Sequence, residues 1–351
     1  MEKLTSEEIK KKIKEDLLKK EQVIKCFANV QKKELKWLWN GKIPIGYLTL
    51  LIGDAGLGKS FVTCDITSRL SNGISFPFDS QVLEPQKILF QNLEDDPEQI
   101  TIYRLEDSGA DVNNVFYIDS SIENGLDLSD INNLIDKIIE IQPKLIVIDP
   151  LTSYMNGTDI DKYKQVYDIL TPLSLIARYF EIAIIGVMHM NKSNTKALYK
   201  TMGSAGFASA ARVVLGITRN PDNEKQRLLC PIKGNYSSEQ NLKEYVFEIT
   251  DKGIAWLEER EPLNIDGLFT YDNDSTTINA KQWLVDYLSS INNHTAPMKE
   301  ILDNADISGF ERLSIEKARK IVCKKPFQKN KCWNWELKEE YIRDSEIRSS
   351  D

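Results

Sequence analysis

The chain contains the octapeptide Gly53-Asp54-Ala55-Gly56-Leu57-Gly58-Lys59-Ser60, which fits the pattern G-x-x-x-x-G-K-[ST]. At average residue usage, roughly one chain in a hundred of this length matches that pattern by accident. The apolar run at 48–52 predicts a buried strand, and residues 61–70 predict a helix that ends at Ser71-Asn72-Gly73. A loop between a strand and a helix turns backbone N–H groups and a helix N-terminus toward a phosphate. The octapeptide therefore predicts a phosphate-binding loop in an α/β fold.

The residue types at the fixed positions of this loop explain its chemistry. Gly56 and Gly58 allow a positive φ and a close approach of the backbone. Lys59 is expected to reach the β- and γ-phosphates of ATP, and the hydroxyl of Ser60 to bind Mg²⁺. A glycine-rich turn without a ligand is the alternative. The predicted nucleotide-binding residues are Gly53, Asp54, Ala55, Gly56, Leu57, Gly58, Lys59, Ser60 and Phe61.

Composition narrows the class of protein that could contain such a loop. The chain has 351 residues, of which 41% are hydrophobic, and a formal net charge of −8. These values are typical of a soluble protein of two or three domains, and they argue against a surface coated for nucleic acid. No apolar run reaches the ~18 residues that span a bilayer, and the charged first residues do not form the apolar core of a signal peptide. The five cysteines form no C-x-x-C pair, which favours reduced thiols and a cytoplasmic location.

Strand-like and helical runs alternate between residues 48 and 258. Because the strand-like runs are continuously apolar, they predict strands buried on both faces of a mostly parallel sheet, and hence an α/β core. After residue 220 the helices stop, and three short runs predict an antiparallel extension of the sheet. The further strands are expected at 87–93, 115–119, 145–149, 182–188, 213–218, 228–232, 245–249 and 254–257, and the further helices at 97–107, 128–141 and 163–179.

Other segments flank this core. Residues 5–25 predict an amphipathic helix, either solvated or packed on a neighbouring subunit, and residues 37–47 predict an ordered lead-in. Helical runs at 278–289, 297–304 and 314–322, followed by a hairpin-like run at 324–335, predict a winged helix-turn-helix. The predicted divisions are 1–46, the N-terminal helical and lead-in segment; 47–258, the ATPase domain; 259–275, a linker; 276–341, the winged helix-turn-helix; and 342–351, a polar tail.

Two acidic residues follow apolar strands and complete a candidate ATP site. Asp149 ends its strand-like run, and a carboxylate at that edge of a parallel sheet can orient water molecules on a loop-bound Mg²⁺. Glu94 follows another strand-like run and is the candidate that orients the attacking water. The alternative for Glu94 is a charge that favours the N-terminus of the next helix, a role that suits Asp95 or Asp96 better.

Candidate sensor and DNA-contacting residues follow along the chain. His189 ends the strand-like run next to Asp149 and is either a sensor of the γ-phosphate or a structural residue. Residues 190–207 are basic and contain glycine, so they are either a solvated loop or the lining of a channel that grips single-stranded nucleic acid. Lys233 ends an outer strand, from which it could reach a neighbouring subunit's γ-phosphate as an arginine finger does. The nucleic-acid contacts expected in the loop are Lys192, Lys196 and Lys200.

Together these residues resemble the RepA-like branch of the RecA-fold ATPases, which includes the hexameric plasmid replicative helicase RepA. The resemblance covers roughly residues 35–255 and implies a ring-forming ATPase that acts on DNA, with Glu94 as catalytic base and Lys233 near a neighbour's nucleotide. Many relatives carry an arginine near Tyr167, where the nearby basic residue here is Lys164. The motifs that carry the likeness are Trp37-Leu38-Trp39, Ile43-Pro44, the phosphate loop, Glu94-Asp95, Asp149-Pro150-Leu151, His189, Asn191-Lys192, Gly203-Ser204, Ala211-Arg212 and Lys233-Gly234-Asn235.

The C-terminal region is similar to the winged-helix appendage of phage and mobile-element members, which implies a nucleic-acid-binding addition. Residues 311–338 carry nine Lys or Arg and three Glu, a local excess of positive charge in an acidic chain. A solvated basic face over a small core built by Trp333 and Trp335 is the alternative. The expected contacts are Lys317, Arg319 and Lys320 on a recognition helix, with Lys324 and Lys329 in the hairpin.

The sequence thus predicts a cytoplasmic, Mg²⁺-dependent, ATP-hydrolysing motor on DNA. It would be a replicative helicase or replication protein of a plasmid, phage or integrated element, and by resemblance a homo-hexamer with single-stranded DNA in its channel and duplex on the winged helix. The alternatives are an ATP-switched DNA-binding regulator or helicase loader without unwinding activity, and an ATPase that acts on proteins without DNA. The predicted catalytic residues are Glu94, Lys59, Asp149, Lys233 and His189, and the predicted metal-site residues are Ser60 and Asp149.

Overall fold

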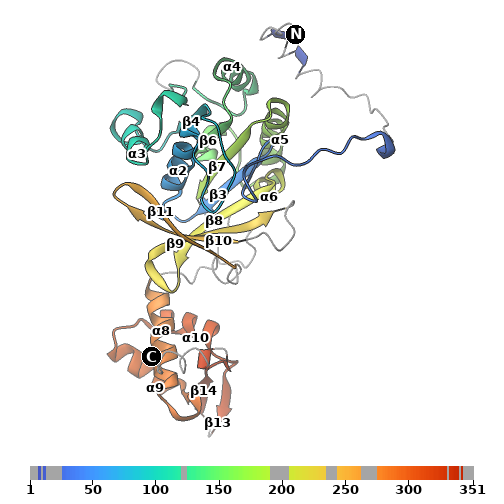
Figure 1. Cartoon of the computed structure of the whole chain (residues 1–351). Helices are drawn as coiled ribbons and strands as arrows, with labels where there is room; N and C mark the ends of the chain where they lie inside the picture. Colours follow the sequence, from blue (N-terminus) through green and yellow to red (C-terminus); the bar gives the residue numbers. More distant parts are fainter. Residues whose placement is uncertain are drawn as a thin grey trace. The chain divides into compact units, whose positions relative to one another are not determined.

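The structure is a computed structural model that describes residues 7–8, 11–12, 26–119, 125–189, 205–234, 243–261, 275–329, 332–339 and 341–342. The chain divides into two compact units, Met1–Ile265 and Asp266–Asp351, each of which is described by itself (Figure 1). Most of the helix predicted at 5–25 lies outside the described residues, of which 7–8 and 11–12 are helical. None of the helices in the described ranges is long and apolar enough to cross a membrane.

The first unit is built on a nine-stranded sheet with β3 at its centre. The strands from β8 to β5 are parallel, and β9, β10 and β11 extend the sheet in antiparallel fashion. Every residue of β3, β6 and β8 except Arg219 is buried, as expected for a sheet covered on both faces. The strand order is β11 (Gly253–Arg260), β10 (Glu244–Thr250), β9 (Asn223–Gly234), β8 (Val213–Asn220), β3 (Leu48–Gly53), β7 (Ala183–His189), β6 (Leu145–Asp149), β4 (Ile88–Asn92) and β5 (Val115–Phe116).

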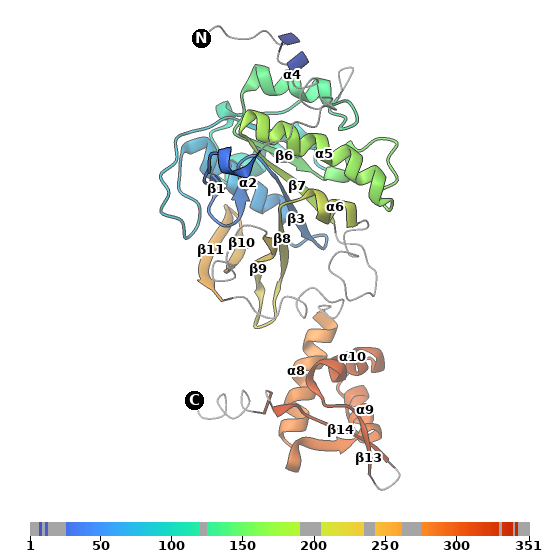
Figure 2. The same cartoon turned by 90° about the vertical axis from the view of Figure 1, so that its right-hand side faces the viewer.

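Helices cover both faces of this sheet (Figures 1 and 2). Leu50 and Ile148 contribute to the core on the face covered by α4 (Ile131–Ile141), α5 (Tyr163–Phe180) and α6 (Ala205–Ala210). Leu51 and Val147 contribute to the core on the opposite face, which holds α2 (Lys59–Asn72) and Leu105 of α3 (Ile102–Asp107). Neighbouring residues of a strand thus serve opposite cores, which explains the continuously apolar runs. The arrangement is the predicted α/β fold, a RecA-like core with an antiparallel extension.

Several predicted boundaries differ from those of the structure. The predicted strand at 115–119 is shorter, because only Val115–Phe116 pairs with β4. The helix predicted at 97–107 is divided into a π-helical turn, Pro97–Thr101, and α3. The helix predicted at 128–141 begins at Ile131, because the Asp130 side chain accepts a hydrogen bond from Asn132 N and caps it. The linker predicted from residue 259 begins later, since β11 continues to Arg260.

The lead-in segment forms a small hairpin that is held by aromatic rings. Its strands are β1 (Trp37–Trp39) and β2 (Ile43–Pro44). Trp39 is fully buried and its ring stacks on Phe76 at a centroid distance of 5.3 Å. The rings of Tyr245 and Trp256, in β10 and β11, lie 5.5 and 5.7 Å from the Trp39 ring. The beginning and the end of the first unit are therefore joined through one aromatic cluster.

A lysine is buried in the turn of the same hairpin. Lys42 is 1% exposed, and its Nζ donates a hydrogen bond to the Lys243 carbonyl at 2.8 Å. The ammonium also lies 4.4 Å from the centre of the Tyr245 ring, a cation–π contact. Burial lowers the pKa of Lys42 from 10.5 to about 8, against the opposing influence of Glu259. The hairpin is thus fastened to β10 by a polar contact as well as by rings.

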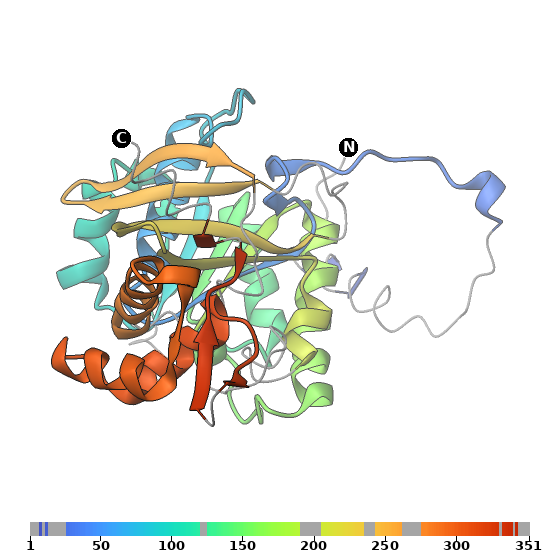
Figure 3. The ribbon, with the colours of Figure 1, turned by 90° about the horizontal axis from the view of Figure 1, so that it is seen from below.

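The described residues of the second unit form three α-helices and a three-stranded sheet, which are drawn in orange and red in Figure 3. Leu284, Ile301, Ile315 and Trp335 are buried in its core. The three helices and the hairpin follow the sequence expectation with shifted bounds, and β12 was not predicted. In chain order the elements are α8 (Ser275–Ser289), β12 (Thr295–Pro297), α9 (Met298–Ile307), α10 (Arg312–Val322), β13 (Phe327–Lys329) and β14 (Cys332–Glu336), with the sheet order β12-β14-β13.

Candidate ATP site

The loop between β3 and α2 has a backbone that only glycine adopts easily. Gly56 has a φ of 75°, and Gly58, which caps α2, has a φ of 93°. A Cβ atom on Gly58 would lie 2.6 Å from Cδ1 of Ile249 in β10. At Gly53, the last residue of β3, a Cβ atom would lie 2.7 Å from the Ile217 carbonyl oxygen. The glycines therefore allow both the turn and its close packing. With no side chain at these positions, the N-terminus of α2 stays accessible, as in a phosphate loop.

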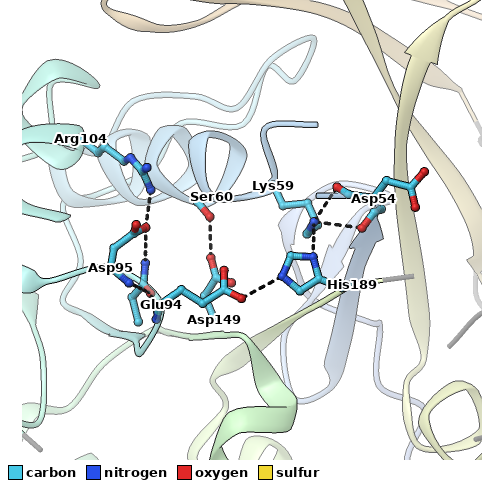
Figure 4. Close-up of polar contacts among 10 residues, drawn as sticks. Asp54, Lys59, Ser60, Glu94, Asp95, Arg104, Asp149 and His189 are labelled. Atoms are coloured by element: carbon cyan, nitrogen blue, oxygen red, sulfur yellow. Dashed lines mark hydrogen bonds and ion pairs between the residues drawn. The ribbon is translucent and has the colours of Figure 1, made fainter. Parts of the chain in front are cut away.

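Lys59, the first residue of α2, directs its ammonium group back over this loop (Figure 4). Its Nζ donates hydrogen bonds to the carbonyl oxygens of Gly53 and Asp54, both at 2.9 Å. The same Nζ lies 3.1 Å from Nδ1 of His189, the last residue of β7. Burial lowers the pKa of Lys59, while the nearby carboxylates of Asp149 and Glu94 oppose that shift.

Ser60 and Asp149 form the second contact of the site. The Ser60 hydroxyl donates a hydrogen bond to Asp149 Oδ2 at 2.9 Å. Asp149 is 1% exposed at the end of β6. Burial raises the pKa of Asp149 to about 6, against the lowering effect of the Ser60 hydrogen bond. A hydroxyl and a carboxylate side by side suit a hard cation such as Mg²⁺, which takes oxygen ligands from protein, water and phosphate.

Glu94 lies in the loop after β4 and approaches the site from the other side. Its Oε1 lies 2.9 Å from Nε2 of His189 (Figure 4). Its backbone N–H donates to Oδ1 of Asn92 at 2.8 Å, which fixes the loop. The neighbouring Asp95 is engaged separately, by Asn92 Nδ2 at 3.1 Å and by an ion pair with Arg104. Of these carboxylates, Glu94 is thus the one directed at Lys59 and His189.

The structure brings five predicted residues together, namely Lys59, Ser60, Glu94, Asp149 and His189. Of the other loop residues, Asp54, Ala55 and Gly56 are exposed, Leu57 is buried, and Phe61 lies under the Arg104 guanidinium, 5.5 Å from the ring centre.

Lys233 is not part of this cluster. In β9 it pairs with Val214 at the beginning of β8, whereas the phosphate loop follows the opposite ends of the parallel strands. Its Nζ donates hydrogen bonds to the carbonyl oxygens of Ala208 and Ala211 at 2.5 and 2.9 Å. Burial lowers the pKa of Lys233. Within its own chain the residue therefore binds the end of α6.

Asn92 and Arg104 support the site and were missed by sequence reasoning, whereas Asp95 was expected as a charge at the start of the next helix and pairs with Arg104. Asn92 holds the backbone of both Glu94 and Asp95 through its side-chain oxygen, at 2.8 and 3.1 Å. A polar residue that ends the strand before Glu94 was the available signal for Asn92. The Asp95–Arg104 ion pair had no signal of its own, because the two residues face each other only once the π-helical turn at 97–101 is formed.

The basic residues predicted to contact nucleic acid differ in their surroundings. Arg319 packs over the buried Trp335 ring at 5.4 Å, and Lys324 pairs with Glu336 and Glu339 at 2.8 and 3.6 Å. Lys320 and Lys329 are exposed, and Lys317 is half-buried. The predicted contacts Lys192, Lys196 and Lys200 lie outside the described residues.

Comparison with known proteins agrees with this site. A family model described as an AAA domain, AAA_25, matches residues 15–195, more than half of the chain. No curated protein matches. Among solved structures, a KaiC-like protein of the hyperthermophilic archaeon Pyrococcus horikoshii OT3 is similar, with 17% identity and a TM-score of 0.46 over 64% of this chain and 100% of that one. By its match to the family model, the chain belongs to the AAA_25 family of AAA domains, and it is a P-loop ATPase of the RecA-fold class.

Proposed function

We propose that this ATPase is a motor that acts on DNA, as a replicative helicase or replication protein of a plasmid, phage or integrated element. The observation that carries the proposal is the convergence of Lys59, the Ser60–Asp149 pair and Glu94 at one edge of the sheet. A cation, a metal-binding pair and a half-exposed carboxylate are the groups that phosphoryl transfer to water requires.

Each residue has a definite task in hydrolysis. The ammonium group of Lys59 donates hydrogen bonds to the Gly53 and Asp54 carbonyls. On ATP binding it would donate to phosphate oxygens instead, because these would lie within reach of the same group. Ser60 and Asp149 would hold Mg²⁺, which supplies positive charge beside the phosphates. Glu94 would accept the proton of the attacking water, because its carboxylate is half-exposed and lies beside His189 at the edge of the site.

The second unit supports the part of the proposal that concerns DNA. Its order of helix, strand, two helices and hairpin is compatible with the proposed winged helix-turn-helix, in which α10 would be the recognition helix. The exposed Lys320, Lys325 and Lys329 and the half-exposed Trp333 provide phosphate-binding charge and a stacking surface on α10 and the hairpin.

We further propose a ring, a homo-hexamer, in which each ATP site is completed by the next subunit. Lys233 is the residue proposed to act across the boundary. To do so it would have to release the carbonyls of Ala208 in α6 and of Ala211 just after it, which it binds within its own chain. Its action would then be coupled to a movement of α6.

The deciding experiment is the steady-state ATPase rate with and without single-stranded DNA at two salt concentrations. The proposal predicts stimulation by DNA that weakens as salt rises. Glu94→Gln should bind ATP without turnover, whereas Glu98→Gln, at an exposed position on the following turn, should retain activity. Near-normal turnover by Glu94→Gln would refute the assignment of the base.

The proposed binding of DNA by the second unit is tested by charge reversal. Lys320→Glu with Lys329→Glu should weaken DNA binding and flatten its salt dependence. Lys252→Glu, in the exposed turn between β10 and β11, is the matched control. If Lys252→Glu weakened the interaction with DNA and the double variant did not, the second unit would be removed from the proposal.

An ATP-switched DNA-binding regulator or helicase loader is the second candidate. The net charge of −8 and the presence of Lys164 rather than an arginine near Tyr167 favour it. In this case ATP would switch assembly, and strand displacement would be absent although DNA binding is intact. A strand-displacement assay on a forked duplex separates the two candidates.

A further inference from the structure

We propose that His189 is a positioning residue that orients the carboxylate of Glu94, and that Lys59 sets the imidazole tautomer which makes this possible. The inference rests on the proposed hydrolytic function and adds a specific link between two of its groups. The link runs from the start of α2, through the last residue of β7, to the loop after β4.

The tautomer follows from the number of protons on Lys59. An ammonium group has three N–H donors and no acceptor. Two of its partners are the carbonyl oxygens of Gly53 and Asp54, which only accept, and the third is Nδ1 of His189 at 3.1 Å. Nδ1 must therefore accept, so the proton of the neutral imidazole resides on Nε2. The Nε2–H group then donates to Glu94 Oε1 at 2.9 Å (Figure 4).

The carboxylate of Glu94 depends on this bond for its direction. The Glu94 side chain is 45% exposed, whereas its backbone is fixed by the Asn92 side chain. The loop therefore determines where Glu94 begins, and His189 determines where its carboxylate points. Asp95 is no substitute, because Arg104 and Asn92 hold it. Since a displacement of about 1 Å of a catalytic group can reduce the rate 10²-fold, loss of the His189 bond should affect turnover rather than binding.

Two amide variants separate the two ends of the imidazole. The side-chain amide of His189→Gln extends about as far as Nε2 and keeps a donor for Glu94, while that of His189→Asn extends only about as far as Nδ1. We expect His189→Asn to lower kcat about tenfold or more with an unchanged Kd for ATP, and His189→Gln to retain most of the wild-type kcat. In a Glu94→Gln background, His189→Asn should cause no further loss, because the group that it positions is already inactive.

Other results would overturn the proposal. Equal losses in both amide variants would indicate a general structural role, and additive losses with Glu94→Gln would exclude action through Glu94. A weakened Kd for ATP with an unchanged Kd for ADP would instead assign His189 to direct sensing of the γ-phosphate. A wild-type protein without ATPase activity would refute the proposed function itself and leave the imidazole to be examined directly.

That direct examination is possible because the chain has two histidines, His189 and His294. Long-range ¹H–¹⁵N NMR of the full-length, nucleotide-free protein identifies the protonated nitrogen of each ring, and the spectrum of His189→Gln assigns the signals. We expect the Nε2–H form at His189 in the wild type and a mixture of tautomers in Lys59→Met. An Nδ1–H form in the wild type, or no change in Lys59→Met, would refute the link irrespective of ATPase activity.

Discussion

The packing of the phosphate loop on β10 leads to a prediction that compares two glycines. Gly56 and Gly58 both have a positive φ, but a Cβ atom on Gly56 would meet nothing within 4 Å, whereas one on Gly58 would lie 2.6 Å from Ile249 Cδ1. Gly56→Ala should therefore show only the strain of the left-handed conformation, about 1–2 kcal/mol. Gly58→Ala adds a contact that must displace the end of the partly buried Ile249 side chain, at a cost of up to about 1–3 kcal/mol, because carbon atoms pack at about 3.5–4.0 Å.

Ile249 provides the control for this comparison. Ile249→Val removes the Cδ1 atom and by itself should lose about 0.5–1.5 kcal/mol. Combined with Gly58→Ala it should recover part of the loss, with a coupling energy of about 0.5–3 kcal/mol, whereas with Gly56→Ala the effects should add.

The assay is native-state hydrogen exchange of the full-length chain, read at the amides of β3, the central strand. These amides exchange through the largest unfolding of the unit and so report its free energy. Equal losses in the two alanine variants would refute the reasoning, since they would show that backbone strain alone decides the cost. An absence of coupling between Gly58→Ala and Ile249→Val would refute it independently, since it would show that Ile249 does not limit the space.

Three further predictions concern residues outside the ATP site. Trp39→Ala should destabilise the ATPase unit by about 3–5 kcal/mol in calorimetry, whereas Trp39→Phe should lose much less, because it also removes an indole N–H that is buried without a partner among the described residues. For Lys42, whose folded pKa is about 8 against an ordinary 10.5, the penalty of burying the charge is complete below pH 8 and is relieved as pH rises toward 10.5. The stability of the wild type relative to Lys42→Met should thus increase over that range by up to about 3 kcal/mol in urea titrations, and a constant difference would contradict the shift. Lys233→Ala should leave the carbonyls of Ala208 and Ala211 unpaired at a cost of about 1–3 kcal/mol, so faster exchange in α6 is expected and unchanged exchange would exclude the contact.

Much of the ATP site could be predicted because a small number of physical rules determine where its residues lie. The carboxyl ends of parallel strands meet at one edge, so apolar runs that end near Glu94, Asp149 and His189 bring those residues toward the loop after β3. The same logic predicted the parallel sheet, since each strand is buried on both faces. Short-range patterns were thus sufficient to predict that these side chains lie together.

The contacts that tune those groups depend on tertiary packing and could not be predicted. Nothing in the chain near His189 indicates that its two nitrogens face Lys59 and Glu94, because those partners lie 130 and 95 residues away. The contact between Arg319 and Trp335 could not be predicted for the same reason. It places one cation of the basic helix α10 over an aromatic ring. The predicted start of a helix was wrong where a single capping side chain determines its first residue, as Asp130 does for α4.

The contacts of β10 and β11 also separate an evolutionary unit from a folding unit. The family match ends at residue 195, before β8, β9, β10 and β11. Yet Ile249 of β10 packs on Gly58, and the Trp256 indole N–H of β11 donates to Asp65 in α2 at 2.9 Å. A fragment cut at the end of the family match would keep the phosphate loop, Glu94, Asp149 and His189, but it would lose the strands β10 and β11 that pack against the loop and α2. The stretch that the family model matches is therefore shorter than the packed unit that surrounds its phosphate loop.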